Sequence, residues 1–193
     1  MKNISILLTD NNSINEKIIV KSLKKLKNCK LDKIIFIGDK KLFSKIYSFS
    51  RRIDKFIFLN IIVNKKNYFE YLKKITLASI RLFKEKKIQA IINMPLDKKK
   101  FLNNKFFGYT EFFSYYFDNK KNETMLLYSD KFSVSPLTTH VEIKNVDKII
   151  TKNKLIISIK NIVNFYKKKV KKKNSNYSFG LKSSCEQRFA KSQ

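Results

Sequence analysis

Residues 4–38, ISILLTDNNSINEKIIVKSLKKLKNCKLDKIIFIG, decide the fold class. The apolar run at 4–8 predicts a first β-strand, and the apolar run at 33–38 predicts a second one. Between them, the polar turn at 10–13 precedes a predicted helix, because four apolar side chains recur at helical spacing: Ile18, Ile19, Leu23 and Leu26. A strand, an amphipathic helix and another strand in succession are the pattern of an α/β domain.

The rest of the chain continues this alternation of short apolar runs and longer amphipathic stretches. We expect a helix after Asp39 and extended chain over 55–63. A helix over 67–86, with Tyr71, Ile75, Ala78 and Leu82 inward, should precede a buried strand over 88–92 that ends at Met94-Pro95. Further along, we expect a helix over 110–117, strands over 124–128 and 132–137, and helices within 146–170. We therefore expect a partial α/β domain over 1–166, followed by a basic, poorly structured tail over 167–193.

The composition is that of a folded but strongly basic protein. The chain has 193 residues, a hydrophobic fraction of 43% and a formal net charge of +28, and only four of its 43 basic residues are arginine: Arg51, Arg52, Arg81 and Arg188. A nucleic-acid binder usually relies on arginine, whose planar fork binds phosphate and guanine through two hydrogen bonds. Two explanations of the lysine excess stay open, namely A/T-rich codon usage at tolerant surface positions and service to a polyanion. Any nucleic-acid binding should be weak and independent of sequence.

Two cysteines and the hydropathy pattern bound the cellular setting. Cys29 and Cys185 lie far apart, which excludes a disulfide scaffold and a cysteine-based zinc site and favours a reducing compartment. No apolar run reaches the roughly 18 residues that a membrane span requires, and the N-terminus lacks the pattern of a signal peptide. We therefore expect a cytoplasmic protein without a membrane partner.

Two segments carry candidate functional side chains. His140, the single histidine of the chain, follows a predicted strand, where ligands gather in α/β sheets, and its imidazole can bind a divalent metal or move a proton. A closed metal site needs three or four ligands, and a structural role is the alternative. Thr110, at the start of a predicted helix, can hold a phosphate through its hydroxyl and the exposed amides, or can simply cap the helix. Glu142 and Asp147 are expected to be solvated or capping groups.

Five segments form an ordered set of motifs: Ile91–Lys98, Gly108–Phe113, Met125–Leu127, Thr138–His140 and Ile149–Thr151. In order and spacing, this set resembles the 4-hydroxythreonine-4-phosphate dehydrogenase family of vitamin B6 synthesis. The resemblance is good over roughly residues 88 to 165 and is only an outline before that, where Thr9–Glu16 stands in place of a glycine-rich turn. It implies an α/β fold similar to the N-terminal portion of an isocitrate/isopropylmalate dehydrogenase-like subunit.

The resemblance also implies a function and a set of site residues. The family oxidises 4-phosphooxy-L-threonine with NAD, and the keto acid decarboxylates to 3-amino-2-oxopropyl phosphate. A divalent metal (zinc, magnesium or cobalt) polarises the reacting oxygens. By resemblance His140 is a metal ligand, Thr110 binds substrate, and Tyr109 stands where the family has a substrate-binding histidine. The family's sites are shared across a homodimer, which is the expected assembly of a full-length form.

Several family groups have no counterpart in this sequence, including two further metal-ligating histidines and much of the cofactor site. We therefore expect the 193-residue chain to be inactive by itself, with a basic non-enzymatic polyanion or RNA binder and a decayed remnant as alternatives. Tyr177–Leu181 resembles the strand that leads, in the family, to the second metal-ligating histidine, whereas Lys182–Cys185 departs from it. A disrupted reading frame near Leu181 would account for this change.

Overall fold

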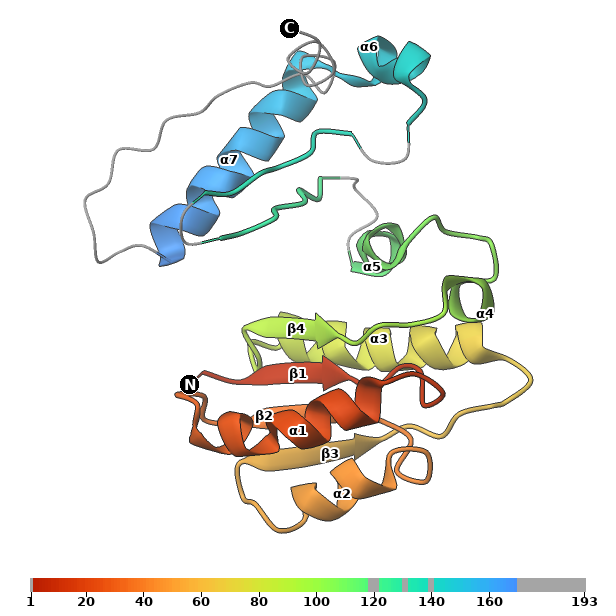
Figure 1. Cartoon of the computed structure of the whole chain (residues 1–193). Helices are drawn as coiled ribbons and strands as arrows, with labels where there is room; N and C mark the ends of the chain where they lie inside the picture. The colour runs from red at the N-terminus through yellow and green to blue at the C-terminus, as the bar shows by residue number, and fades with distance from the viewer. Residues whose placement is uncertain (1, 118–121, 130–131, 139–140, 170–193) are drawn as a thin grey trace, which may run out of the picture. The chain divides into compact units, whose positions relative to one another are not determined.

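The computed structural model describes residues 2–117, 122–129, 132–138 and 141–169. The chain forms two compact units, Met1–Glu123 and Thr124–Gln193. The first unit holds a parallel sheet with its covering helices, and the second contains a long helix (Figure 1).

The first unit is built on four parallel strands: β1 (Ile4–Leu7), β2 (Ile34–Gly38), β3 (Phe56–Asn60) and β4 (Ala90–Asn93). Their order in the sheet is β3-β2-β1-β4. Ile4 of β1 pairs with Ile34 of β2 on one side and with Ala90 of β4 on the other. The predicted α/β class is thereby confirmed.

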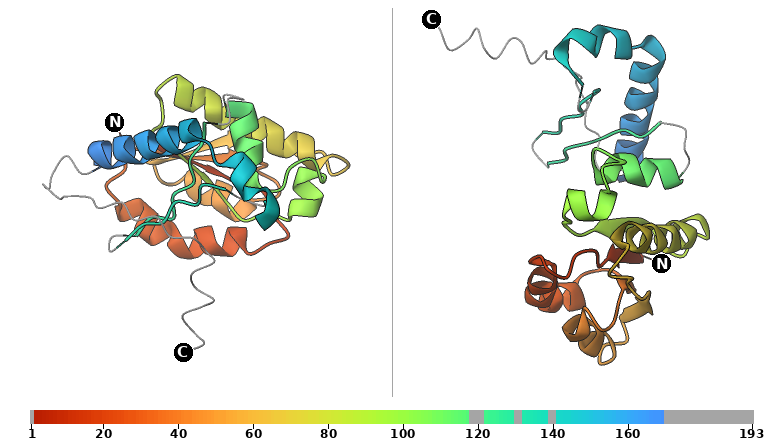
Figure 2. Two further views of the ribbon diagram at one scale, coloured as in Figure 1. Left: turned by 90° about the horizontal axis from the view of Figure 1, so that it is seen from above. Right: turned by 90° about the vertical axis from the view of Figure 1, so that its right-hand side faces the viewer.

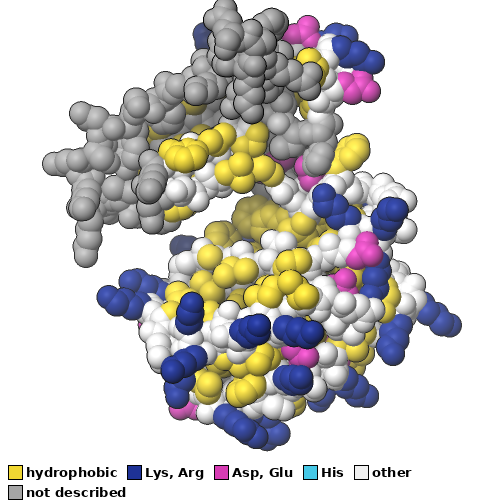
Figure 3. Space-filling view, in the orientation of Figure 1, with side chains coloured by type: hydrophobic (Ala, Val, Ile, Leu, Met, Phe, Trp, Pro, Cys, Tyr) yellow, Lys and Arg dark blue, Asp and Glu magenta, His cyan; other side chains and the backbone are white. Residues whose placement is uncertain are grey.

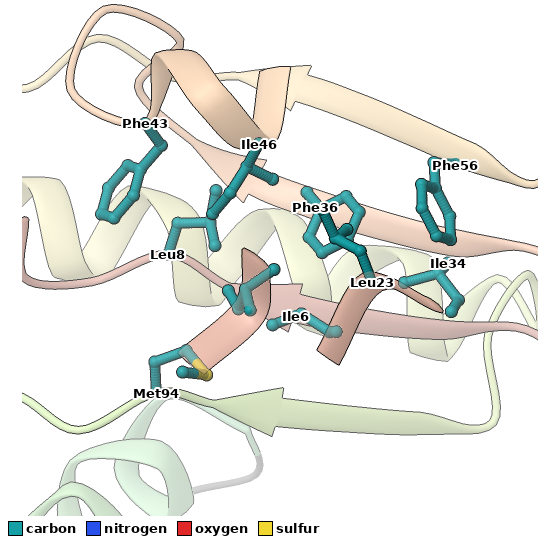
Figure 4. Close-up of a cluster of buried hydrophobic side chains, with 10 residues drawn as sticks. Ile6, Leu8, Leu23, Ile34, Phe36, Phe43, Ile46, Phe56 and Met94 are labelled. Atoms are coloured by element: carbon teal, nitrogen blue, oxygen red, sulfur yellow. The ribbon is translucent and has the colours of Figure 1, made fainter. Parts of the chain in front are cut away.

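Helices cover both faces of this sheet (Figure 2). The helices α1 (Asn15–Asn28) and α2 (Ser44–Ser50) pack on one face, and α3 (Tyr68–Lys84), α4 (Lys98–Leu102) and α5 (Tyr109–Phe117) belong to the other. Successive strand residues point to opposite faces. Ile6 and Phe36 therefore join the cluster under α1 and α2 (Figure 4), whereas Leu7 and Ile37 join the cluster under α3.

Side-chain caps set where several helices begin. The Asn67 side chain accepts a hydrogen bond from the Glu70 N–H at 3.0 Å and starts α3, close to the expected boundary at residue 67. Asp97 Oδ1 accepts from the N–H groups of Lys99 and Lys100 and starts α4 in the same way. The Asp97 cap thus fixes where the chain that leaves β4 turns into a helix.

The helix expected after Asp39 is α2, which begins at Ser44. Of the apolar side chains that recur along α1, Ile19 and Leu23 are buried and Ile18 is exposed. One expectation for the first unit needs correction. The strand expected to be buried over 88–92 is β4, which pairs only with β1 among the described strands. Its Ile92 side chain is therefore 43% exposed.

The second unit contains a 3₁₀ turn (Ile143–Asn145), α6 (Val146–Ile149) and α7 (Lys152–Lys169). The strands expected over 124–128 and 132–137 are wrong, because the described residues there form one antiparallel bridge, Leu127 with Val134. A single bridge leaves both of these side chains exposed, so there is no buried face to extend the pairing. The helical expectation over 146–170 is confirmed by α6 and α7.

Several expectations fall outside the described residues. His140, the end of the basic tail from Val170 onward, and the departure near Leu181 all lie there. Within the described ranges, no helix is both long enough and apolar enough to cross a membrane.

Candidate functional site at the carboxyl edge of the sheet

The strand order creates one topological switch point in the first unit. From β1 the chain proceeds outward to β2 and β3, then returns to place β4 on the other side of β1. In open α/β sheets, ligands bind beyond the carboxyl ends of the strands where the order reverses. The space between the ends of β1 and β4 is therefore the first place to look for a site.

Polar side chains from the β1–α1 turn fill this position. The Thr9 hydroxyl lies 3.2 Å from the Met94 carbonyl oxygen and 3.0 Å from that of Pro95, so it donates to the turn after β4. Asn15 Nδ2 donates to the carbonyl oxygens of Asp10 at 3.1 Å and Pro95 at 2.7 Å. Asn15 is fully buried and its Oδ1 has no hydrogen-bond partner.

A buried acid and a lysine lie beside this turn. The Lys100 ammonium is 3.6 Å from Asp10 Oδ1 and 4.0 Å from the centre of the Tyr68 ring. Asp10 Oδ1 also accepts a hydrogen bond from the Asn12 N–H at 3.0 Å. The carboxylate thus has two internal partners, which stabilise its charge in a buried position.

The ends of β2 and β3 are tied to neighbouring loops in a similar way. Asp39, buried after β2, accepts hydrogen bonds from the Lys41 and Val63 N–H groups, both at 2.8 Å. The Tyr71 hydroxyl donates to the Leu8 carbonyl at 2.7 Å and accepts from the Asp39 N–H at 3.2 Å. Burial raises the pKa of the Tyr71 hydroxyl far above its usual value, so this group stays protonated.

The two residues predicted to bind substrate are neighbours at the start of α5 but differ in access. Thr110 is exposed in the first turn. The Tyr109 hydroxyl lies 3.2 Å from Thr76 Oγ1 of α3 and is hydrogen-bonded to it. Burial raises the pKa of Tyr109 to about 12. Tyr109 is therefore no proton acceptor at neutral pH, and its hydroxyl already has one hydrogen-bond partner in Thr76.

The predicted metal ligand and its acidic neighbours are not assembled into a site. His140 lies outside the described residues. Glu142 pairs with Lys144 at 3.0 Å and accepts from the Asn145 side chain, a local solvated arrangement. In the part of the chain that the structure describes, no group of three or more His, Cys, Asp or Glu side chains could hold a metal ion. The described residues therefore do not fit the metal that the resemblance implies.

Thr9, Asp10, Asn15 and Lys100 were not predicted as site residues from the sequence. The available signal was position, because the first three lie in or directly after the turn that follows the first predicted strand. Lys100 carries no such signal, since it reaches Asp10 only through the pairing of β1 with β4.

An open parallel sheet covered by helices on both faces, with polar groups at its switch point, defines a doubly wound α/β protein of the kind that binds ligands at this edge. The family model described as "Pyridoxal phosphate biosynthetic protein PdxA" matches residues 30–178. The chain belongs to this family, and the resemblance noted from its motifs is confirmed.

Individual relatives agree with this assignment. A 4-hydroxythreonine-4-phosphate dehydrogenase from Sulfurihydrogenibium sp. (strain YO3AOP1) is 27% identical, over 88% of this chain and 59% of that protein. Two crystal structures of enzymes with the same name share the fold. The enzyme from Burkholderia phymatum has a TM-score of 0.64 at 20% identity and the match covers 83% of this chain and 56% of that one. For the enzyme from Klebsiella pneumoniae the TM-score is 0.65 at 18% identity, covering 89% and 61%. The chain thus spans about three fifths of the length of these relatives.

Proposed function

We propose that this chain is a 4-hydroxythreonine-4-phosphate dehydrogenase-like protein of vitamin B6 biosynthesis and that residues 1–193 alone do not complete the oxidation. The match of the family model over residues 30–178 carries the first part of this proposal. The second part is supported by the described residues, which supply no metal-ligand set. The two cysteines, too few for a disulfide framework, support a cytoplasmic location.

The proposed substrate is 4-phosphooxy-L-threonine. Its oxidation moves a hydride from the hydroxyl-bearing carbon to NAD and releases the hydroxyl proton. The resulting keto acid loses carbon dioxide to give 3-amino-2-oxopropyl phosphate. NAD and a divalent metal (zinc, magnesium or cobalt) are the proposed cofactors, with His140 as one metal ligand. The described residues supply no group of three or more further ligands for that metal.

The candidate substrate-binding residues lie at the start of α5. Thr110 is exposed in the first turn of α5, where its hydroxyl and the positive end of the helix dipole favour a phosphate. Tyr109 is the weaker candidate, because its hydroxyl is already bonded to Thr76. Without an acid–base group at position 109, the oxidation loses the proton transfer that such groups supply.

An activity assay tests the catalytic part. The purified chain is incubated with 4-phosphooxy-L-threonine, NAD and each divalent metal, and NADH absorbance is followed against a His140→Ala control. We expect equal, background rates from both proteins. Metal-dependent NADH formation by the wild-type chain above the control would show that the inactivity proposal is wrong.

A binding assay tests the substrate part separately. Calorimetric titration with 4-phosphooxy-L-threonine is run on the wild type, on Thr110→Ala and on Thr151→Ala. Thr151 is a matched control, because its hydroxyl accepts a hydrogen bond from the Lys154 N–H at the start of another helix. We expect Thr110→Ala alone to weaken binding. An equal effect of both substitutions would mean that the Thr110 hydroxyl makes no specific contact with the substrate.

A homodimer is the proposed assembly of a full-length form. The observation that favours association is the absence of a buried side chain among the described residues of 124–167, although several large apolar side chains lie there. Sedimentation at several concentrations measures this directly, and a strictly monomeric chain at high concentration would contradict it.

The charge supports a second candidate function, weak polyanion binding. Lysine and arginine side chains are spread over the visible surface of the first unit, with few acidic ones between them (Figure 3). Dispersed lysines bind phosphates by counterion release, so affinity should fall steeply with salt and should not depend on sequence. A complex with RNA that survives ~0.5 M salt, or that strongly prefers one sequence, would contradict this candidate.

A further inference from the structure

The turn between β1 and α1 is closed by its own side chains. Thr9 is 1% exposed and Asp10 5%, although both lie in the connection between β1 and α1, and Asn15, the first residue of α1, is 0% exposed. Connecting segments usually lie on the surface. Burial of these three polar side chains therefore indicates that the turn and the helix start have a structural partner, which is the chain leaving β4.

Asn15 makes the central contacts of this arrangement. Its Nδ2 donates to the Asp10 carbonyl within the turn and to the Pro95 carbonyl across the switch point. The Thr9 hydroxyl lies 3.3 Å from the same nitrogen and donates to the Met94 and Pro95 carbonyls. The side chains of Thr9 and Asn15, which we call the switch-point clamp, thus join the ends of β1 and β4.

A first βα turn that binds a dinucleotide needs an open backbone and not a turn closed by buried side chains. The backbone must approach the pyrophosphate closely, which favours glycine, and free N–H groups at the helix start must face the phosphates. In this chain a buried amide side chain fills that approach. The Asn15 N–H lies 3.2 Å from Ser13 Oγ, and the Glu16 carboxylate in the first turn of α1 accepts from the Lys45 N–H. The helix start therefore already has a hydroxyl and an anion beside it.

We infer that the switch-point clamp holds the Met94-Pro95 turn in place, and that NAD does not bind at the β1–α1 turn. The implied cofactor and the residues present do not fit at this position. The consequence reaches further along the chain, because the Met94-Pro95 turn leads directly to Asp97 and to α4. Asn15 is thus a positioning residue for the segment between β4 and α5. The part that concerns NAD rests on the proposed function, whereas the positioning role of Asn15 does not.

A titration of the wild-type chain tests the ligand part. Backbone amide resonances of residues 9–16 are followed by NMR while NAD, ADP-ribose or pyrophosphate is added to millimolar concentration. We expect no saturable change in these resonances. Saturable changes within 9–16 would overturn the inference, including the case in which the unpartnered Asn15 Oδ1 accepts a hydrogen bond from the ligand. Saturable changes confined to other residues would leave it standing and would indicate a cofactor site elsewhere.

Hydrogen exchange of two variants tests the positioning part. Asn15→Ala removes the clamp, and Asn12→Ala, which alters an exposed side chain in the same turn, is the matched control. Loss of buried hydrogen bonds should speed exchange of the Met94 and Phe101 amides roughly tenfold in Asn15→Ala, with the β2 amides affected less. Asn12→Ala should resemble the wild type. Unchanged exchange at Met94 and Phe101 in Asn15→Ala would overturn the positioning role. Should Asn15→Ala fail to fold, the wild-type titration still decides the ligand part.

Discussion

Replacing Tyr71 by phenylalanine tests the buried link between β1 and β2. The Tyr71 side chain is 2% exposed and lies in the cluster between the sheet and α3. Its hydroxyl serves two backbone groups, the Leu8 carbonyl at 2.7 Å and the Asp39 N–H at 3.2 Å. Tyr71→Phe keeps the ring and its packing but removes both hydrogen bonds.

The expected cost follows from the two groups that lose their partner. A buried backbone group without a hydrogen bond costs roughly 1–3 kcal/mol, so the loss of two partners in Tyr71→Phe should lower the free energy of unfolding by about 2–6 kcal/mol. A change of this size lowers the Tm of a protein of this length by roughly 4–24 °C. The accompanying urea midpoint should fall without a change in the denaturant slope, because the surface exposed on unfolding is nearly the same.

The assay is urea unfolding of the whole chain at pH 7, followed by far-UV circular dichroism. Tyr115→Phe is the matched control, since Tyr115 is 52% exposed and retains its ring contacts with Phe106 and Tyr116. The control should lie within about 0.5 kcal/mol of the wild type. Equal effects of the two substitutions would refute the assigned role of the Tyr71 hydroxyl.

Two further predictions concern the same unit. Gly38→Ala would place a Cβ 2.6 Å from Leu8 Cβ and 3.2 Å from the Leu8 carbonyl oxygen, so we expect a loss of about 1–3 kcal/mol or more in urea unfolding; a midpoint equal to that of the wild type would contradict this close approach. For Tyr109, the folded pKa of about 12 lies above the ordinary value near 10, so its stabilising contribution is full below pH 10 and is lost as the pH rises toward 12. The free energy of unfolding of the wild type should therefore fall more steeply over this range than that of Tyr109→Phe, by up to about 1.4 kcal/mol per pH unit, and parallel curves would disprove the buried hydroxyl.

Local periodicity explains which parts of the fold could be predicted from the sequence. The first two strands, α1 and α3 can be predicted from the sequence, because strand and helix patterns repeat over a few residues and depend only on neighbouring side chains. The strands expected over 124–128 and 132–137 were not formed beyond one bridge, because the same short apolar runs need a partner surface that no local pattern supplies.

The candidate site also contains features that local sequence predicts and features that depend on packing. Thr110 could be placed at the start of a helix from its neighbours alone, and the structure puts it there. The engagement of Tyr109 with Thr76 could not be predicted, because those residues belong to different helices and meet only through packing.

The sequence by itself determined the α/β class and the family, because hydrophobic periods and ordered motifs are properties of the linear chain. Only the tertiary structure decided that β4 lies beside β1 and that Asn15 therefore reaches the Pro95 carbonyl, 80 residues away. Contacts of that kind depend on the order of strands in the sheet, which no local pattern specifies. Thr9 and Asn15 consequently act as a clamp because the Met94 and Pro95 carbonyls lie beside them in the folded chain.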